Sequence, residues 1–436
     1  MRRTTQRAPL PLLIAIGAAC SADPEAPSAG SGGVPAASGG TSATGGVSAS
    51  GGETTTGGAG TGGAPAAGGT AGSGAAGTGG GPAAGGAGGD AGSSSGGLGG
   101  ASGAPGGGAG GMDATAGAGG GAAGSGPMDS VDSDGCPITL EGFATVDAMG
   151  QDGTYGGRDG QTVTVKNQGE LEQYAGASEP YVIRVQGTIQ ITPKGKEIRV
   201  ASHKTLLGVG ATAAIAEGGF NLGAGTHNVI LRNLTIRDSF VEGDWAGDTQ
   251  DFDGIQLDSA HHIWIDHCHL HHMGDGLIDS RKDTTFVTTS WNILSDHNKA
   301  YGIGWTENVT AQMTIHHNWL RDLNQRNPAV DNVLRAHLFN NFMQRIDAYG
   351  NHARGGTNMV LENSVFDDVN RPHFYDTGTL VARGNLYRSS PGDRTSTGSS
   401  YSFFDPSEHY AYTLHPTEEV EALLAKCAGP RPTLGL

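Results

Sequence analysis

The chain has 436 residues, a length that would ordinarily suggest about two or three domains, and 77 of them are glycine. Its formal net charge of −17 at pH 7 disfavours nucleic acid as a partner, because binding to phosphates requires a basic face. An acidic protein also repels acidic polymers, so a partner of that kind would need cations to mediate the contact.

Residues 1–20 have the features of an export signal. Positive charge is followed by an apolar run over 10–16 that is too short to span a membrane as a helix. Small residues then lead to Cys20, as in bacterial lipoprotein signals, although Gly17 stands where such signals usually carry leucine. Lipidation of Cys20, which would anchor the chain to a membrane, and ordinary cleavage nearby are two alternatives, and both predict a protein outside the cell.

Residues 21–135 are predicted to form a disordered linker. Gly, Ala, Ser and Thr dominate this segment, and it has almost no large apolar residue between Ala26 and Gly126. Such a composition cannot bury enough surface to offset the entropy of ordering the chain. The remaining residues, 136–436, are enough for one domain with a large core, and we expect this domain to be monomeric.

Three cysteines fall within this predicted domain. Cys136 opens it and Cys427 nearly closes it. In an exported protein these two can form a disulfide, which we weigh equally against two unpaired thiols. Cys268 lies in an alternating apolar segment, which predicts a buried free thiol.

From Val163 to Arg388 the sequence shows a series of short apolar alternations and no long helical pattern. β-Branched residues recur at every second position, as in strands, and a turn-rich stretch follows each alternation. Examples are NVILRNLTI from Asn228, HIWIDHCHL from His262 and QMTIHHNWL from Gln312.

Asparagine recurs in these units at intervals of about 22 to 26 residues, which is a solenoid period. The residues are Asn292, Asn318, Asn341, Asn363 and Asn385. An asparagine at an inward turn can bond neighbouring backbone and stack on its counterpart in the next coil. Leucine-rich repeats also carry such asparagines, but these units lack regular leucines and a helical half. The pattern therefore favours an all-β fold, a right-handed parallel β-helix.

Two pairs of aspartates follow in neighbouring units. Asp251 and Asp253 lie in DFDGIQLD, and Asp275 and Asp279 lie in GDGLIDS. The members of each pair have the same parity along an extended segment, and stacking would bring the two pairs together on one outer face. An all-oxygen site of this kind suits Ca²⁺. The alternative is a set of solvated aspartates in surface turns.

Two cations and a group of histidines come next to these aspartates in the chain. Lys299 lies one unit after Asp279, and Arg326 lies one unit further on, before a proline-containing turn. Either cation could instead be a solvated surface residue. The histidines suggest zinc as a rival, but strand alternation favours a ladder of packed rings. They are His261, His262, His267, His269, His271 and His272.

At these residues the chain resembles polysaccharide lyase family 1, the pectate lyases. The resemblance covers residues 142–430 and keeps the family's order of motifs. These motifs include TLLGVG from Thr205, WIDH from Trp264, GDGLID from Gly274 and QRNPAV from Gln325. The resemblance implies the same β-helix fold.

The resemblance also implies a calcium site. By position, Asp253, Asp275 and Asp279 match the family's calcium ligands, and Asp251 matches an aspartate that joins when substrate and further calcium are present. Pectin lyases, which share the fold and act on methylated substrate, lack this acidic group. The resemblance therefore implies calcium-dependent cleavage of polygalacturonate, in which calcium bridges an acidic protein and an acidic sugar.

The resemblance assigns the cations as well. Lys299 matches a lysine that binds a substrate carboxylate, and Arg326 matches the catalytic arginine of an RxPxxR motif. The second arginine of that motif is replaced by Asp331, and Arg335 is the predicted substitute for substrate binding.

In the implied β-elimination, Arg326 would take the C5 proton, although a guanidinium loses its proton only with difficulty. Lys299 or hydroxide is the alternative base. Two other classes of protein stay open. One is a non-catalytic β-helix that only binds pectin, and the other is a glycoside hydrolase, which would need two facing carboxylates.

Overall fold

The computed structural model describes residues 131–398 and 404–435. The predicted signal at 1–20, Cys20 and the linker as far as residue 130 lie outside the described residues. No helix in the described part of the chain is long and apolar enough to cross a membrane.

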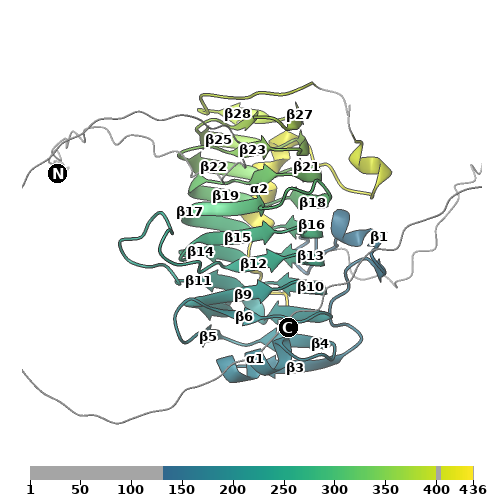
Figure 1. Ribbon diagram of the computed structural model, residues 1–436, viewed down its shortest axis with the longest axis vertical. Helices are drawn as coiled ribbons and strands as arrows, with labels where there is room; N and C mark the ends of the chain where they lie inside the picture. The colour runs from purple at the N-terminus through teal and green to yellow at the C-terminus, as the bar shows by residue number, and fades with distance from the viewer. Residues whose placement is uncertain (1–130, 399–403, 436) are drawn as a thin grey trace, which may run out of the picture. The chain divides into compact units, whose positions relative to one another are not determined.

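The described chain winds into a parallel β-helix, as predicted, with the coils stacked in chain order (Figure 1). One face of the coils is a ten-stranded parallel sheet. Its strands are β3 (Gln161–Val165), β4 (Tyr181–Val185), β7 (Lys204–Gly208), β10 (His227–Arg232), β13 (His261–Asp266), β16 (Thr285–Ser290), β18 (Ala311–His316), β21 (Val333–Phe339), β24 (Asn358–Glu362) and β27 (Thr379–Arg383).

The other sheet has 16 strands in two stacks, which the long strand β17 (Ile293–Gly304) joins. The first stack also contains β5 (Thr188–Gln190), β8 (Ala214–Ala216), β11 (Thr235–Arg237), β14 (His269–His271), β19 (Trp319–Gln325), β22 (Phe342–Ile346), β25 (Val365–Val369) and β28 (Leu386–Arg388). The second stack also contains β6 (Lys196–Arg199), β9 (Gly218–Leu222), β12 (Ile255–Asp258), β15 (Gly276–Arg281), β20 (Ala329–Asp331), β23 (Asn351–Arg354) and β26 (His373–Tyr375).

The remaining elements are short. Strands β1 (Asp147–Ala148) and β2 (Gln151–Asp152) form an antiparallel pair. Helix α1 (Gln168–Ala175) covers the end of the solenoid beside β3 and β4 (Figure 1), and Asn167 caps it by accepting from the Glu170 N–H. Helix α2 (Thr417–Cys427) packs against β22 and β25. Three 3₁₀ turns complete the list: η1 (Phe143–Thr145), η2 (Gly210–Thr212) and η3 (Pro406–Glu408).

The core follows from the parallel register. On the ten-stranded sheet, Val229, Ile263, Val287 and Met313 are direct partners on successive strands, and all four are buried. Like side chains therefore stack about one strand spacing apart through the interior. The period-two alternation of the sequence places these residues inside and their neighbours outside.

The asparagine ladder is confirmed except at one position. Asn292 N–H donates to Asn318 Oδ1 at 3.1 Å, and Asn318 N–H donates to Asn341 Oδ1 at 3.0 Å. The next position is held by Ser364, whose N–H donates to Asn385 Oδ1. The prediction for Asn363 is therefore wrong. It occupies the preceding bend, where the backbone is left-handed with φ 42°, and its amide reaches the carbonyl of His415.

The cysteines resolve the alternatives left open by the sequence. Cys136 and Cys427 form a disulfide, which joins the start of the described chain to the end of α2. Cys268 is a free, buried thiol, as predicted, and burial raises its pKa to about 12.

Candidate active site

The predicted metal ligands lie where the second stack of strands begins on two successive coils. Asp253 precedes β12 and Asp275 precedes β15, and the parallel pairing of these strands brings the two residues together. Carboxylate oxygens of Asp251, Asp253 and Asp275 lie within 4.8 Å of one another. Asp253 is buried and Asp251 is exposed, so the group opens to solvent on one side.

Asp279 lies in β15 beside these three residues, and a glycine makes room for it. A Cβ on Gly276 would lie 2.7 Å from Asp279 Oδ1 and 3.0 Å from Asp253 Oδ1. The Gly276 N–H also donates to Asp253 Oδ1 at 2.7 Å. Any larger residue at this position would force the two carboxylates apart. We call Asp251, Asp253, Asp275 and Asp279 together the acidic cluster.

The acidic cluster is electrostatically unfavourable by itself. Burial raises the pKa of Asp253 well above its ordinary value, and the neighbouring charges of Asp279 and Asp275 raise it further. Burial also raises the pKa of Asp279 to about 7, against the lowering effect of Arg326. The pKa of Asp275 is raised by burial too, although its hydrogen bond with Lys299 opposes the shift. Buried like charges disfavour one another, so a bound cation would stabilise this arrangement.

Two oxygens of the acidic cluster lack a hydrogen-bond partner among the described residues, namely Asp253 Oδ2 and Asp279 Oδ1. Buried polar atoms in folded proteins nearly always have a partner. Calcium binds sets of carboxylate and carbonyl oxygens and accepts irregular geometry. The residues present therefore fit a calcium ion.

Lys299 lies directly beside the acidic cluster. It is the register partner of Gly276 on the next coil, and its side chain is largely buried. Its Nζ donates to Asp275 Oδ1 at 2.7 Å and to the carbonyl of Gly247 at 3.4 Å. The lysine therefore neutralises one member of the cluster while its ammonium group stays at the edge of the site.

Arg326 lies at the bend between β19 and β20, one coil beyond Lys299. Its backbone is left-handed, with φ 59°, and its carbonyl accepts a hydrogen bond from the Tyr301 N–H at 2.7 Å. The residue as a whole is half-buried, and its charge lowers the pKa of both Asp275 and Asp279. The structure thus brings both predicted cations to the acidic cluster.

The structure does not bring Arg335, the predicted substitute for the motif's second arginine, to this site. It lies on β21, in the ten-stranded sheet, where its Nη1 donates to Gln312 Oε1 at 3.1 Å. Asn332, with a left-handed φ of 53°, turns the chain from one face to the other after Asp331. Asp331 itself faces Arg354, its register partner on the next coil, at 4.0 Å.

Two tryptophans that were not predicted from the sequence, Trp245 and Trp305, border the site. The Arg326 guanidinium carbon lies 5.4 Å from the ring centroid of Trp305. Trp245 packs on His297, with ring centroids 6.2 Å apart. The run GIGW, which ends in Trp305, could have indicated an aromatic residue at the site, because glycines beside an aromatic residue often leave room for its ring.

The histidines form stacked rings, as predicted. His227 stacks on His261 at 5.0 Å, His262 on Phe286 at 4.9 Å, and His267 on Trp291 at 6.0 Å. His271 and His272 also stack, with ring centroids 6.4 Å apart, and their ligand atoms lie within 4.8 Å of one another and of Asp238. Among the described residues, the one histidine-containing group that could hold a metal ion is therefore Asp238, His271 and His272.

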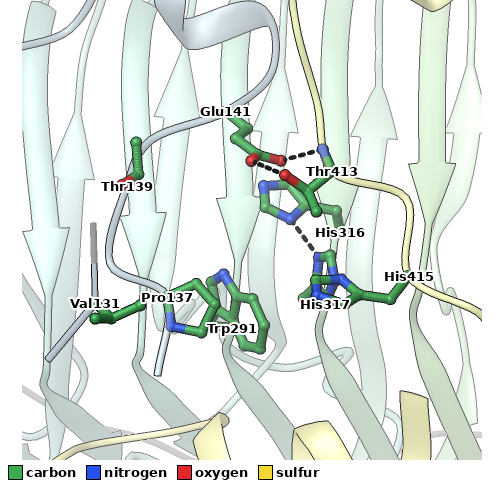
Figure 2. Close-up of a pocket in the computed structure, with 9 residues that line it drawn as sticks. All are labelled: Val131, Pro137, Thr139, Glu141, Trp291, His316, His317, Thr413 and His415. Carbon is green, nitrogen blue, oxygen red and sulfur yellow. Dashed lines mark hydrogen bonds between the residues drawn. The ribbon is translucent and has the colours of Figure 1, made fainter. Parts of the chain in front are cut away.

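A cavity of about 370 Å³ lies elsewhere, between the chain segments that begin and end the described domain (Figure 2). Glu141 and Thr413 form part of its wall and bond to each other, with the Thr413 N–H donating to Glu141 Oε2 at 2.9 Å. Its lining contains none of the predicted site residues. The lining residues are Val131, Pro137, Thr139, Glu141, Trp291, His316, His317, Thr413 and His415.

Comparison with known proteins agrees with this geometry. A family model described as pectate lyase matches residues 136–431. The pectate trisaccharide-lyase of Thermotoga maritima is 31% identical over 327 residues, which cover 66% of this chain and 87% of that protein. The pectate trisaccharide-lyase of Bacillus licheniformis is 30% identical over 311 residues, covering 67% and 86% of the two chains.

Solved structures show the same fold. The pectate lyase Bsp165PelA from Bacillus sp. N165, solved in complex with trigalacturonate, superposes with a TM-score of 0.56 at 25% identity. The match covers 68% of this chain and 99% of that one. A pectate lyase from Acidovorax avenae superposes with a TM-score of 0.57 at 21% identity and covers 70% and 96% of the two chains.

Proposed function

Because this chain belongs to the pectate lyase family and is therefore a polysaccharide lyase, we propose that it cleaves polygalacturonate by calcium-dependent β-elimination. The observation that carries the calcium dependence is the acidic cluster, in which Asp253 and Asp279 flank Gly276 and each has one buried carboxylate oxygen without a hydrogen-bond partner among the described residues. Relatives named pectate trisaccharide-lyase and a relative solved with trigalacturonate support the choice of substrate.

Asp253, Asp275 and Asp279 would hold calcium, and Asp251 would join them from the exposed side. When bound, the ion supplies positive charge that stabilises a developing uronate anion. The need for such a cation is independent of the family, since a chain with a net charge of −17 otherwise repels a polyuronate. The acidic cluster likewise favours demethylated pectate over methylated pectin, which carries no charge to bridge.

The residues of the chain itself supply the rest of the proposed reaction. Lys299 donates hydrogen bonds to the uronate carboxylate and stabilises the charge that develops there. Arg326 takes the proton from C5, and the electron pair of that bond forms the C4–C5 double bond as the bond from C4 to the glycosidic oxygen breaks. Water gives the departing oxygen its proton. Lys299 or hydroxide remains the alternative base.

The first test is an absorbance assay of purified protein on polygalacturonate and on methylated pectin, with and without a chelator. We expect an increase in ultraviolet absorbance from unsaturated products on polygalacturonate alone, lost with chelator and restored by added calcium. A glycoside hydrolase would instead give saturated products without absorbance, and a binding module would give no new reducing ends. Turnover that survives exhaustive chelation would contradict the proposal.

The second test replaces the proposed base. Arg326→Ala should lower kcat on polygalacturonate by more than about 100-fold, since a general base contributes roughly 10²- to 10⁴-fold to the rate. Arg335→Ala is the matched control, because Arg335 lies on another face of the coil and should leave turnover unchanged. If Arg326→Ala keeps more than a tenth of the activity, the base is Lys299 or hydroxide.

We also propose that the protein acts outside the cell. The disulfide between Cys136 and Cys427 supports this location, because disulfides persist in oxidising compartments. Fractionation of a producing culture tests the proposal and separates a free protein in the medium from one held at the membrane through Cys20. Recovery in the cytosol alone would contradict it.

A further inference from the structure

Two tryptophans are half-exposed at the edges of the proposed site. Trp245 is 52% exposed and Trp305 is 50% exposed, whereas Trp264 and Trp291 are buried in the body of the domain. An exposed large aromatic side chain costs hydration free energy that packing could have recovered. Single exposed apolar residues are common, so the position of these two relative to the acidic cluster carries the argument.

Trp305 borders the site at Arg326 and Asp279. A Cβ on Gly302 would lie 2.4 Å from Trp305 Cη2 and 2.9 Å from Asp279 Oδ1, so the ring and that carboxylate flank the same glycine. The other neighbour of the ring is the Arg326 guanidinium. The ring thus adjoins the proposed base and a proposed metal ligand, and half of its surface still faces solvent.

Trp245 borders the site at Lys299 and Asp275. It lies in the loop between β11 and β12, and its ring contacts Phe240 and His297. The same loop brings the Gly247 carbonyl to Lys299 Nζ at 3.4 Å, and a Cβ on Gly247 would lie 2.8 Å from Asp275 Oδ1.

The two rings therefore bracket the reacting groups. Trp245 packs at His297 and Trp305 packs at Gly302, and these two positions of strand β17 are five residues apart. An extended strand covers about 17 Å over that distance. Lys299 lies between these two positions, and Asp275 precedes Gly276, the register partner of Lys299.

We propose that Trp245 and Trp305 are sugar-binding platforms on either side of the cleavage point and determine how the enzyme binds galacturonate chains of different length. The C–H faces of a pyranose ring are apolar and lie flat on an aromatic ring, while the carboxylates and hydroxyls at its rim remain free to meet charged groups. The identity of the sugar rests on the proposed function, whereas the two platforms rest on the geometry of the rings.

The test compares Trp245→Ala and Trp305→Ala with Trp245→Tyr and Trp305→Tyr on oligogalacturonates of increasing length. Each alanine variant should raise KM on long substrates by about 3- to 10-fold, the size of one aromatic stacking contact, and tyrosine should restore most of the affinity. The increase should shrink on the shortest substrates, which cannot reach both platforms. Leu386→Ala is the control, because Leu386 is also exposed but lies on β28.

A binding readout without turnover completes the experiment. In the Arg326→Ala background, the longest oligogalacturonate of the series should protect the exposed tryptophans from acrylamide quenching, and this protection should fall when Trp245 or Trp305 is replaced by tyrosine. Unchanged KM values at every length in both alanine variants of an active enzyme would overturn the inference. So would a loss of kcat in Trp305→Ala that is equal at all lengths, because the ring would then only position Arg326. Failure of the proposed function itself would appear differently, as a wild-type protein that neither cleaves nor binds these sugars.

Discussion

Asp266 and Asp279 are both buried aspartates of this β-helix, yet their surroundings are opposite. Asp266, on β13, has Arg232 Nε at 2.7 Å, His267 Nδ1 at 2.7 Å and the Ser290 hydroxyl at 2.7 Å. Burial by itself would raise the pKa of Asp266, but His267 and Arg232 outweigh that effect and hold the pKa below its ordinary value.

Asp279, on β15, has the reverse balance. Its Oδ1 lacks a partner among the described residues, its neighbour across Gly276 is another aspartate, and its pKa is raised to about 7, chiefly by burial. Asp266 thus has its cations within the fold, whereas the cation for Asp279 would, in the proposed function, be a bound metal ion. Two aspartates at similar burial therefore differ in pKa because their hydrogen-bond and ion-pair partners differ.

The largest expected effect is on stability at Asp266. Asp266→Asn keeps the shape of the side chain but leaves Arg232 as a largely buried, uncompensated charge, so the free energy of unfolding should fall by about 3–5 kcal/mol. Urea denaturation with and without calcium measures this loss. The folded fraction should retain wild-type kcat, and a loss below about 1 kcal/mol would contradict the structural role of Asp266.

The next largest effect is on activity at Asp279. Asp279→Asn should lower kcat/KM at limiting calcium by about 100-fold, or about 2.7 kcal/mol, because the site loses a charged ligand. Metal-free stability should stay equal or rise, since the substitution removes a buried charge without a partner. Excess calcium should recover part of the activity. A variant with wild-type calcium dependence would remove Asp279 from the proposed ligands.

A smaller effect, on the pH dependence of stability, distinguishes Asp279 from Asp266. Since the folded-state pKa of Asp279 lies above its ordinary value of 3.8, its contribution to metal-free stability is present at low pH and is lost as the pH rises towards about 7. Calcium binds the ionised carboxylates, so stabilisation by calcium should grow over the same window and reach about 2.7 kcal/mol at 100 times Kd.

Thermal unfolding with chelator and with calcium, from about pH 4 to pH 7, measures both trends. Asp279→Asn should flatten them. If Asp279→Asn changes neither trend, Asp279 resembles Asp266, whose lowered pKa confines its effect on the pH dependence of stability to pH values below its ordinary value of 3.8.

Much of the fold was predictable because every coil of a solenoid repeats the same pattern of buried, exposed and turn positions. Alternation placed Val229 and Ile263 in the core, and the asparagine period located the ladder to within one residue. The miss at Asn363 shows the limit. Asparagine also suits a left-handed bend, so its presence does not say whether it holds the bend or the ladder position that follows.

The sequence predicted which types of residue would form the site, but only some of the predicted residues lie there. Asp253, Asp275, Lys299 and Arg326 come together as their spacing and the family resemblance implied. Arg335 does not join them, although it is only four residues from Asp331, because the bend at Asn332 carries the chain to another face. The number of residues between two positions does not reveal at which residue the coil bends from one face to the next.

The sequence by itself determined the fold class, the family and the set of charged residues from which a metal site could be built. The tertiary structure decided which carboxylates lack partners, which arginine lies on another face, and that Trp245 and Trp305 flank the proposed site. The physical reason is that period and residue type are local properties, whereas partnership depends on the register of coils more than 20 residues apart, and there a shift of one residue exchanges the inside of the coil for the outside.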